Sequence, residues 1–151
     1  MAVLAELELD AQVSTRGAPQ PGFPVEPNTI ATVEGRTVLW LGPDEWLVLG
    51  GREQDYPRAA AAVDVSAGRV VLELSGADAL DLVAQGCSLD LHPSAFAPGN
   101  CAQTLLGRAQ VTLVRPDEER VLILVRPSFA PYVRAWLEDA ASAATSRRPS
   151  R

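Results

Sequence analysis

Short runs of apolar and β-branched residues recur through the chain, and turn residues separate them. This pattern is typical of β-strands bounded by tight turns. Two of the turns are led by proline, at Gly42-Pro43-Asp44 and at Pro116-Asp117, where the fixed φ of proline favours the second position of a turn. The runs predict six strands, over residues 37–41, 45–49, 69–74, 101–106, 110–114 and 120–125.

Helical periodicity is clearest near the end of the chain. Six apolar residues there fall at i, i+3, i+4, i+7, i+8 and i+11, which predicts an amphipathic helix. They are Phe129, Tyr132, Val133, Trp136, Leu137 and Ala140.

Two shorter helices are also expected. An alanine-rich stretch predicts a helix over residues 53–63. The second helix follows Ser75-Gly76-Ala77-Asp78, which reads as a capping box, and Gly86 is suited to its end.

The order strand, turn, strand, helix occurs at residues 37–63 and again at 110–140. This repetition predicts two similar halves that together form one sheet with helices packed on one face. The expected fold class is therefore α+β, a single domain with a mostly antiparallel sheet.

The ends of the chain differ in composition from the middle. Residues 1–29 hold the proline- and glycine-rich stretch 17–28 and are expected to form an extended arm, either disordered or laid across a partner. Residues 30–142 are expected to form the α+β domain, and the Arg- and Ser-containing residues 143–151 to form a disordered tail.

Composition excludes several classes of function. The 151 residues are 47% hydrophobic and 21% charged, which suits a packed core, and the net charge of −6 disfavours a nucleic-acid partner. All 13 basic residues are arginine, so neither a Schiff-base lysine nor a P-loop lysine is present. Without a long apolar run or a secretory signal, the expected location is the cytoplasm, with no membrane contact and with reduced thiols.

The residues that could carry chemistry are few and scattered. Either Cys87 or Cys101 could be drawn together with His92 and Asp90 as a nucleophile and its base, but core packing is the commoner role of cysteine. Metal-ligand spacing is absent, and Gly50-Gly51 resembles a nucleotide loop only weakly. We therefore expect no catalytic, cofactor-binding or metal-ligating residue on this chain.

A protein partner is the remaining possibility. Trp40 and Trp46 flank the first turn, where an indole could anchor an interface or pack in the core. Arg108 and Arg126 could pair with carboxylates of a partner or remain solvated. The residues expected at an interface are Phe23, Trp40, Trp46, His92 and Arg108.

Three stretches resemble one known family. They are residues 28–31 (NTIA) with 39–47 (LWLGPDEWL), residues 63–66 (VDVS) with 74–79 (LSGADA), and residues 86–93 (GCSLDLHP) with Phe96 and 98–106 (PGNCAQTLL). Together, over about residues 28–140, they are similar to the gamma subunits of heterotetrameric sarcosine oxidases. The middle stretch is shared with the folate-binding domain of the glycine-cleavage aminomethyltransferases.

The resemblance implies a fold like the first domain of those aminomethyltransferases. It also implies a complex that oxidises sarcosine to glycine and hydrogen peroxide and passes the one-carbon unit to tetrahydrofolate. Alpha, beta and delta subunits would be the partners and would hold FAD, FMN, NAD and tetrahydrofolate. The gamma subunit would carry no cofactor and would support assembly and stability.

Two other functions stay open from the residues alone. A stand-alone folate-dependent enzyme would need a deep pocket and a carboxylate such as Asp64 or Asp90 for the pterin. A small adaptor could bind folate or a related ligand without catalysis, in which case the ligand would raise its thermal stability.

Overall fold

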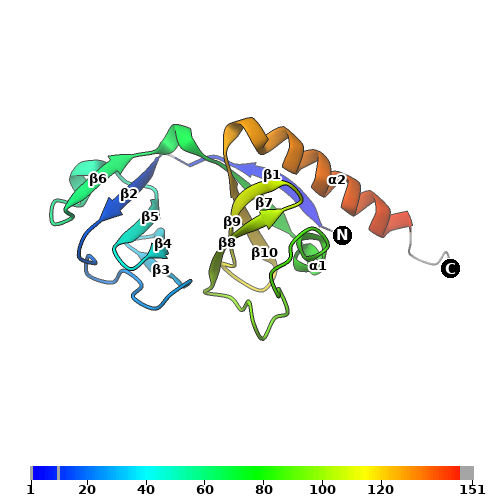
Figure 1. The fold of residues 1–151 in the computed structure, drawn as a ribbon, viewed down its shortest axis with the longest axis horizontal. Coiled ribbons are helices and arrows are strands. Elements are labelled where there is room, and N and C mark those ends of the chain that lie inside the picture. Colours follow the sequence, from blue (N-terminus) through cyan, green and yellow to red (C-terminus); the bar gives the residue numbers. More distant parts are fainter. Residues whose placement is uncertain (1, 10, 147–151) are drawn as a thin grey trace.

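A computed structural model describes residues 2–9 and 11–146, which form two five-stranded antiparallel sheets with two α-helices (Figure 1). Sheet A has the order β1 (Val3–Leu7), β7 (Val70–Ser75), β10 (Arg120–Val125), β9 (Ala109–Val114) and β8 (Cys101–Leu106). Sheet B has the order β3 (Ile30–Val33), β4 (Arg36–Gly42), β5 (Glu45–Leu49), β2 (Gln12–Arg16) and β6 (Ala61–Asp64). The helices are α1 (Ala79–Ala84) and α2 (Ala130–Ser146), with 3₁₀ turns η1 (Glu53–Asp55), η2 (Ser66–Gly68) and η3 (Pro127–Phe129).

The expected fold class is confirmed, and the six predicted strands are β4, β5, β7, β8, β9 and β10, each within one residue of its expected bounds. The expectation of a single sheet is wrong, because the strands divide between two sheets. Sequence periodicity defines which face of a strand is apolar, but it does not say which sheet the strand joins.

The two sheets are joined by the chain at one end and by hydrogen bonds at the other. The chain passes from sheet A to sheet B between β1 and β2, and it returns between β6 and β7. Gln12 ties the two crossings together: its main-chain N–H donates to Ser66 Oγ at 2.8 Å, and its side-chain amide donates to the Arg69 carbonyl at 3.0 Å. At the far corner, Thr29 and Asn100 form an isolated antiparallel bridge.

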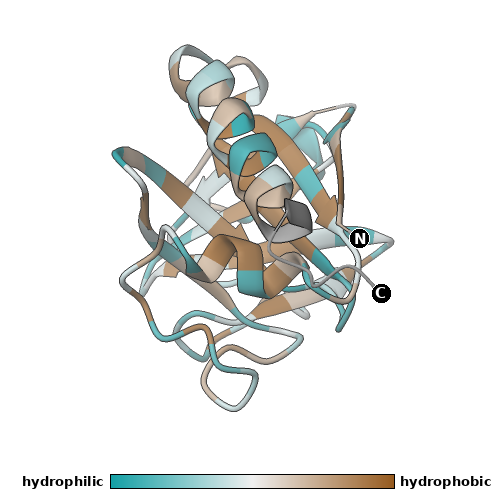
Figure 2. Ribbon diagram, turned by 90° about the vertical axis from the view of Figure 1, so that its right-hand side faces the viewer, coloured by the Kyte–Doolittle hydropathy of each residue, from teal (hydrophilic) through white to brown (hydrophobic). Residues whose placement is uncertain are grey.

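Three apolar layers hold the fold together. The layer between the sheets joins Leu39 and Leu47 of sheet B to Val114 and Leu122 of sheet A. The outer face of sheet A is covered by α1 and α2, and Figure 2 looks onto this side, where both helices lie across largely hydrophobic strands. The outer face of sheet B is covered by Phe23 and Tyr56, from the segments before β3 and after η1.

The helix expected over residues 53–63 does not form. Its place is taken by the short turn η1 and by β6, which pairs with β2. Pro57 follows η1 and has no N–H to continue a helix, and Tyr56 is buried against Phe23. The internal repetition therefore holds only for the strand pairs, and only the second pair is followed by a helix, α2.

The capping box expected at Ser75–Asp78 is also absent. Ser75 ends β7, and α1 begins after Asp78, whose side chain makes no cap hydrogen bond. Gly86 follows α1, but its backbone does not adopt the left-handed conformation, with positive φ, that favours glycine at the end of a helix. A Cβ at this position would collide with the indole of Trp136, so the close approach of α2 is what favours glycine here.

Residues 1–29 differ from the expected arm. Their described part holds two strands: β1 is an edge strand of sheet A, and β2 lies between β5 and β6 inside sheet B. The loop after β2 is irregular, and it lies against the outer face of sheet B through Phe23. In the expected tail, residues 143–146 are the last turn of α2, and residues 147–151 lie outside the described part.

Neither α1 nor α2, nor any other helix in the described part of the chain, is long and apolar enough to span a bilayer.

Candidate functional site

Two of the five expected interface residues belong to the core. Phe23 and Trp46 are 7% and 2% exposed, and their ring centroids lie 6.0 Å apart. The indole N–H of Trp46 donates to the Pro24 carbonyl at 2.8 Å. Both side chains are therefore used within this chain and leave little surface for a partner.

Trp40 lies next to Trp46 across the β4–β5 pair and packs against the same cluster, but it is only half-buried. Its indole thus has one side in the core and one side toward solvent. Of the two tryptophans at the first turn, Trp40 alone keeps a surface that a partner could cover.

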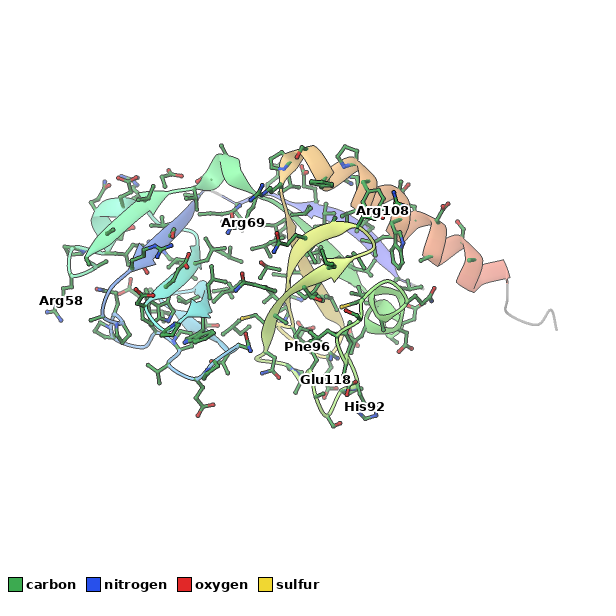
Figure 3. All side chains as sticks on the ribbon, viewed as in Figure 1. Arg58, Arg69, His92, Phe96, Arg108 and Glu118 are labelled. Carbon is green, nitrogen blue, oxygen red and sulfur yellow. The ribbon has the colours of Figure 1, made fainter. Side chains whose placement is uncertain are left out.

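His92 and Arg108 are both exposed but lie in different places (Figure 3). His92 sits in the long loop between α1 and β8, where its Nδ1 and Ser94 Oγ are 2.7 Å apart. Arg108 sits in the β8–β9 turn beside α2, and its main-chain N–H donates to the Tyr132 hydroxyl at 3.1 Å. The structure therefore does not bring the expected interface residues together into one site.

The residues that could have formed a nucleophile and base are engaged separately. Cys87 Sγ lies 3.5 Å from Thr104 Oγ1, and the Asp90 carboxylate accepts from the main-chain N–H of His92 at 2.9 Å. Cys101 is buried, and this burial raises the pKa of its thiol to about 11. Within residues 2–9 and 11–146, no three His, Cys, Asp or Glu side chains are placed to share a metal ion.

A hollow of about 730 Å³ lies at one end of sheet B, lined in part by Arg36, Gly51, Asp55 and Asp64. Three of its charged side chains, those of Arg36, Asp55 and Asp64, have partners. Arg36 lies 3.2 Å from Asp55, and the Asp64 carboxylate accepts from both the N–H and the hydroxyl of Ser66.

These hydrogen bonds, above all that from the Ser66 hydroxyl, lower the pKa of Asp64. Asp64 therefore stays ionised and partnered, and Asp90 lies elsewhere, in the α1–β8 loop. The two carboxylates considered for a pterin do not converge on one pocket.

An exposed aromatic group at the start of α2 was not expected from the sequence. Phe129 and Tyr132 are 43% and 38% exposed, although the periodicity placed them on the buried face. The buried stripe of α2 consists instead of Ala130, Val133, Leu137 and Ala140. A stripe of six apolar positions is wider than the part of a helix that one sheet can cover. The width of the stripe was therefore the sequence feature that could have indicated that some of these residues are exposed.

We call the group formed by Arg108, Phe129, Tyr132 and Trp136 the aromatic corner. Its base is rigid, because Tyr132 and Trp136 lie directly against Gly107, which has φ of +58° and no Cβ to obstruct them. Tyr, Trp and Arg are the residues that dominate protein–protein binding energies, and here Tyr132 and Arg108 are exposed while Trp136 is partly buried. In its chemistry, the aromatic corner suits a protein partner better than a small substrate.

Comparisons with known proteins agree with each other over nearly the whole chain. Residues 21–143 match the family model of the sarcosine oxidase gamma subunit family. The sarcosine oxidase subunit gamma of Corynebacterium sp. (strain P-1) is 37% identical over 161 aligned positions, which cover 92% of this chain and 79% of that protein. The corresponding subunit of an Arthrobacter species is 33% identical, with 91% of this chain and 79% of that protein covered.

The same likeness appears among solved structures. A chain of the heterotetrameric sarcosine oxidase from Corynebacterium sp. U-96, solved in complex with pyrrole 2-carboxylate, superimposes with a TM-score of 0.85. The two sequences are 28% identical, and the match covers 99% of this chain and 88% of the other.

Proposed function

Because the chain belongs to the sarcosine oxidase gamma subunit family, we propose that it acts as a non-catalytic subunit of a sarcosine-oxidising complex, which it helps to assemble and stabilise. The observation that carries this proposal is the match of its whole fold to a chain of a heterotetrameric enzyme. The pairing of its polar side chains with one another, described above, agrees with a role in support rather than in chemistry.

In this proposal the partners are alpha, beta and delta subunits, and the complex works in the cytoplasm. FAD, FMN, NAD and tetrahydrofolate are held by those subunits, and the complex converts sarcosine to glycine and hydrogen peroxide. This chain contributes none of the groups that react.

The aromatic corner is the surface that we propose for contact with a neighbouring subunit. Phe129 and Arg108 are exposed, and neither has a role in the core that would explain an aromatic and a guanidinium at these positions. Covering them in the complex removes apolar surface from water while Tyr132 and Trp136 keep their present packing.

The test is to co-express the tagged chain with the three other subunits and to purify by the tag. We expect a large yellow assembly with flavin absorbance and sarcosine-dependent peroxide production. A colourless chain recovered alone would refute the subunit role, and stabilisation of that chain by tetrahydrofolate would then favour the adaptor.

The double substitution Arg108→Ser with Phe129→Ser tests the contact surface. Loss of a binding hot spot of about 2 kcal/mol corresponds to an affinity about 30-fold lower, so far less flavin-bearing partner should be recovered. The matched control is Arg58→Ser with Val25→Ser, two exposed residues associated with sheet B. Equal recovery of partners by the corner variant and the control would place the contact elsewhere on the chain.

A further inference from the structure

Two arginines lie opposite each other where β7 begins and β10 ends. The antiparallel register of these strands pairs Leu124 with Val71 and Val125 with Val70. The next residues, Arg126 and Arg69, both have extended backbone, so the same register sets them directly across from each other. Because side chains alternate along a strand, both arginines face the side of sheet A that looks toward sheet B.

Like charges directly opposite on neighbouring strands are unfavourable, and a carboxylate between them would normally relieve the repulsion. The chain has 19 acidic residues for 13 basic ones, so such a carboxylate could readily have been supplied. Among the described residues, however, none forms an ion pair with Arg69 or Arg126. Glu45 acts on Arg69 at longer range, but its carboxylate lies 3.4 Å from Arg16.

Arg69 is also half-buried, so its charge has lost part of its hydration. This burial lowers the pKa of Arg69; Glu45 acts in the opposite direction, and Arg126 lowers it again. A guanidinium in such a place that has no carboxylate partner among the described residues is unfavourable unless an anion joins it.

The space in front of the two arginines is a small cavity of about 230 Å³. Its wall is made by two cross-strand rows of sheet A. In the first row, Gln110 of β9 follows Arg69 and Arg126. In the second row, Leu124 of β10, Thr112 of β9 and Gln103 of β8 lie side by side. The amide of Gln103 donates to the Leu41 carbonyl at 3.1 Å, which closes one side against sheet B. The cavity thus combines two cations with neutral polar groups, and its exposed lining is mainly polar.

We propose that this cavity, which we call the arginine cavity, binds the carboxylate group of an organic ligand between Arg69 and Arg126. The planar fork of a guanidinium matches a carboxylate, and two forks side by side can each take one oxygen. The site is separate from the aromatic corner and does not depend on the proposed subunit role.

The test uses the purified full chain with malonate as the probe. We expect malonate to raise the melting temperature by about 2 °C or more and to show saturable binding by calorimetry. Malonamide, which has the same shape without charge, should have no effect. Chloride and phosphate at the same ionic strength should have less effect than malonate.

Arg69→Gln and Arg126→Gln should each weaken malonate binding by about 10-fold or more. Both variants should fold, because the hydrogen bonds of these residues within the fold are to their main-chain carbonyls, which accept from Gln12 at Arg69 and from Phe129 and Ala130 at Arg126, and each substitution relieves the repulsion. Arg58→Gln is the matched control, since Arg58 is exposed at the far end of sheet B (Figure 3) and should leave malonate binding unchanged.

Three results would overturn the proposal: a malonate effect no larger than that of malonamide, an equal effect of chloride or phosphate, or unchanged malonate binding by both cavity variants. A comparison with the assembled complex distinguishes the sources of the carboxylate. If the complex binds malonate as the free chain does, the ligand is a small molecule. If the complex no longer binds it and the variants assemble poorly, the carboxylate comes from a partner's side chain.

Discussion

Three aromatic residues from distant parts of the chain meet on the outer face of sheet B. Phe23 packs against both Trp46 and Tyr56, with ring centroids 6.0 Å apart in each pair. Their tilted and edge-on arrangements are those that aromatic rings prefer. The proline-rich loop therefore acts as a cover for sheet B, fixed by Phe23 and by the hydrogen bond from Trp46 to Pro24.

Substitution of Trp46 by phenylalanine should lower the free energy of unfolding by about 2–4 kcal/mol. The change leaves the buried Pro24 carbonyl without its donor and opens space beside Phe23. Urea unfolding followed by circular dichroism measures the loss. Trp40→Phe is the control, because Trp40 is only half-buried, and a loss as large as that for Trp46 would contradict this assignment of roles.

The thiol of Cys101 should be almost unreactive in the folded chain. Burial raises its pKa from 9.0 to about 11. At pH 8 the thiolate fraction is then about 100-fold below that of an ordinary cysteine. A thiol reagent should modify Cys87 first, and Cys101 only after denaturant is added. Rapid modification of both cysteines without denaturant would refute the buried position.

The raised pKa of Cys101 also determines the direction in which the free energy of unfolding changes with pH. The protonated thiol is favoured in the folded state, so its contribution to stability is complete below pH 9. It is lost between pH 9 and 11, because the unfolded chain ionises first. The free energy of unfolding should therefore fall more steeply over this range in the natural chain than in Cys101→Ala.

At the level of elements, the first sixteen residues are part of the fold rather than an appendage. β1 is an edge strand whose Leu4 and Leu7 are half-buried, whereas β2 is paired on both sides and holds the buried residues Val13 and Thr15. The two strands should therefore differ in how much stability they contribute.

Deletion of residues 1–8 should lower the free energy of unfolding by about 2–4 kcal/mol and leave a folded chain, because it removes one edge strand and two half-buried leucines. Deletion of residues 1–16 should abolish folding, because it leaves a gap in the middle of sheet B. Melting curves of both truncations provide the measurement. Equal stability of the two would show that β2 is as dispensable as an arm.

The strands that could be predicted from sequence are those with clear apolar runs and turn residues. β6 could not, because its alanines have high helix propensity, and only its pairing with β2 makes it a strand. β1 and β2 were obscured by the prolines and glycines that follow them, and the four-residue β3 was also missed. For β1, β2 and β6, tertiary pairing overrides the local preference of the residues.

At the level of the whole molecule, the family could be recognised from sequence, but the surfaces could not. Tyr132 and Val133 are neighbours on one apolar stripe, and only the placement of α2 on sheet A decides that one is exposed and the other buried. The arginine cavity likewise depends on the register between strands separated by some fifty residues. Arg126 stood out in the sequence as a possible partner for a carboxylate, but nothing there placed Arg69 opposite it.

The passage of the chain from sheet A to sheet B and back also constrains the order in which the two sheets can form during synthesis. β1 is synthesised first, yet its only partner within the described residues is β7, which begins at Val70. At a ribosomal rate of about 5–20 residues per second, β1 waits on the order of 3–13 s for that partner. Sheet A is complete only after β10, so sheet B must close inside an unfinished chain. Pairings this distant in sequence make folding slow, and the exposed strand edge is then open to mispairing during translation.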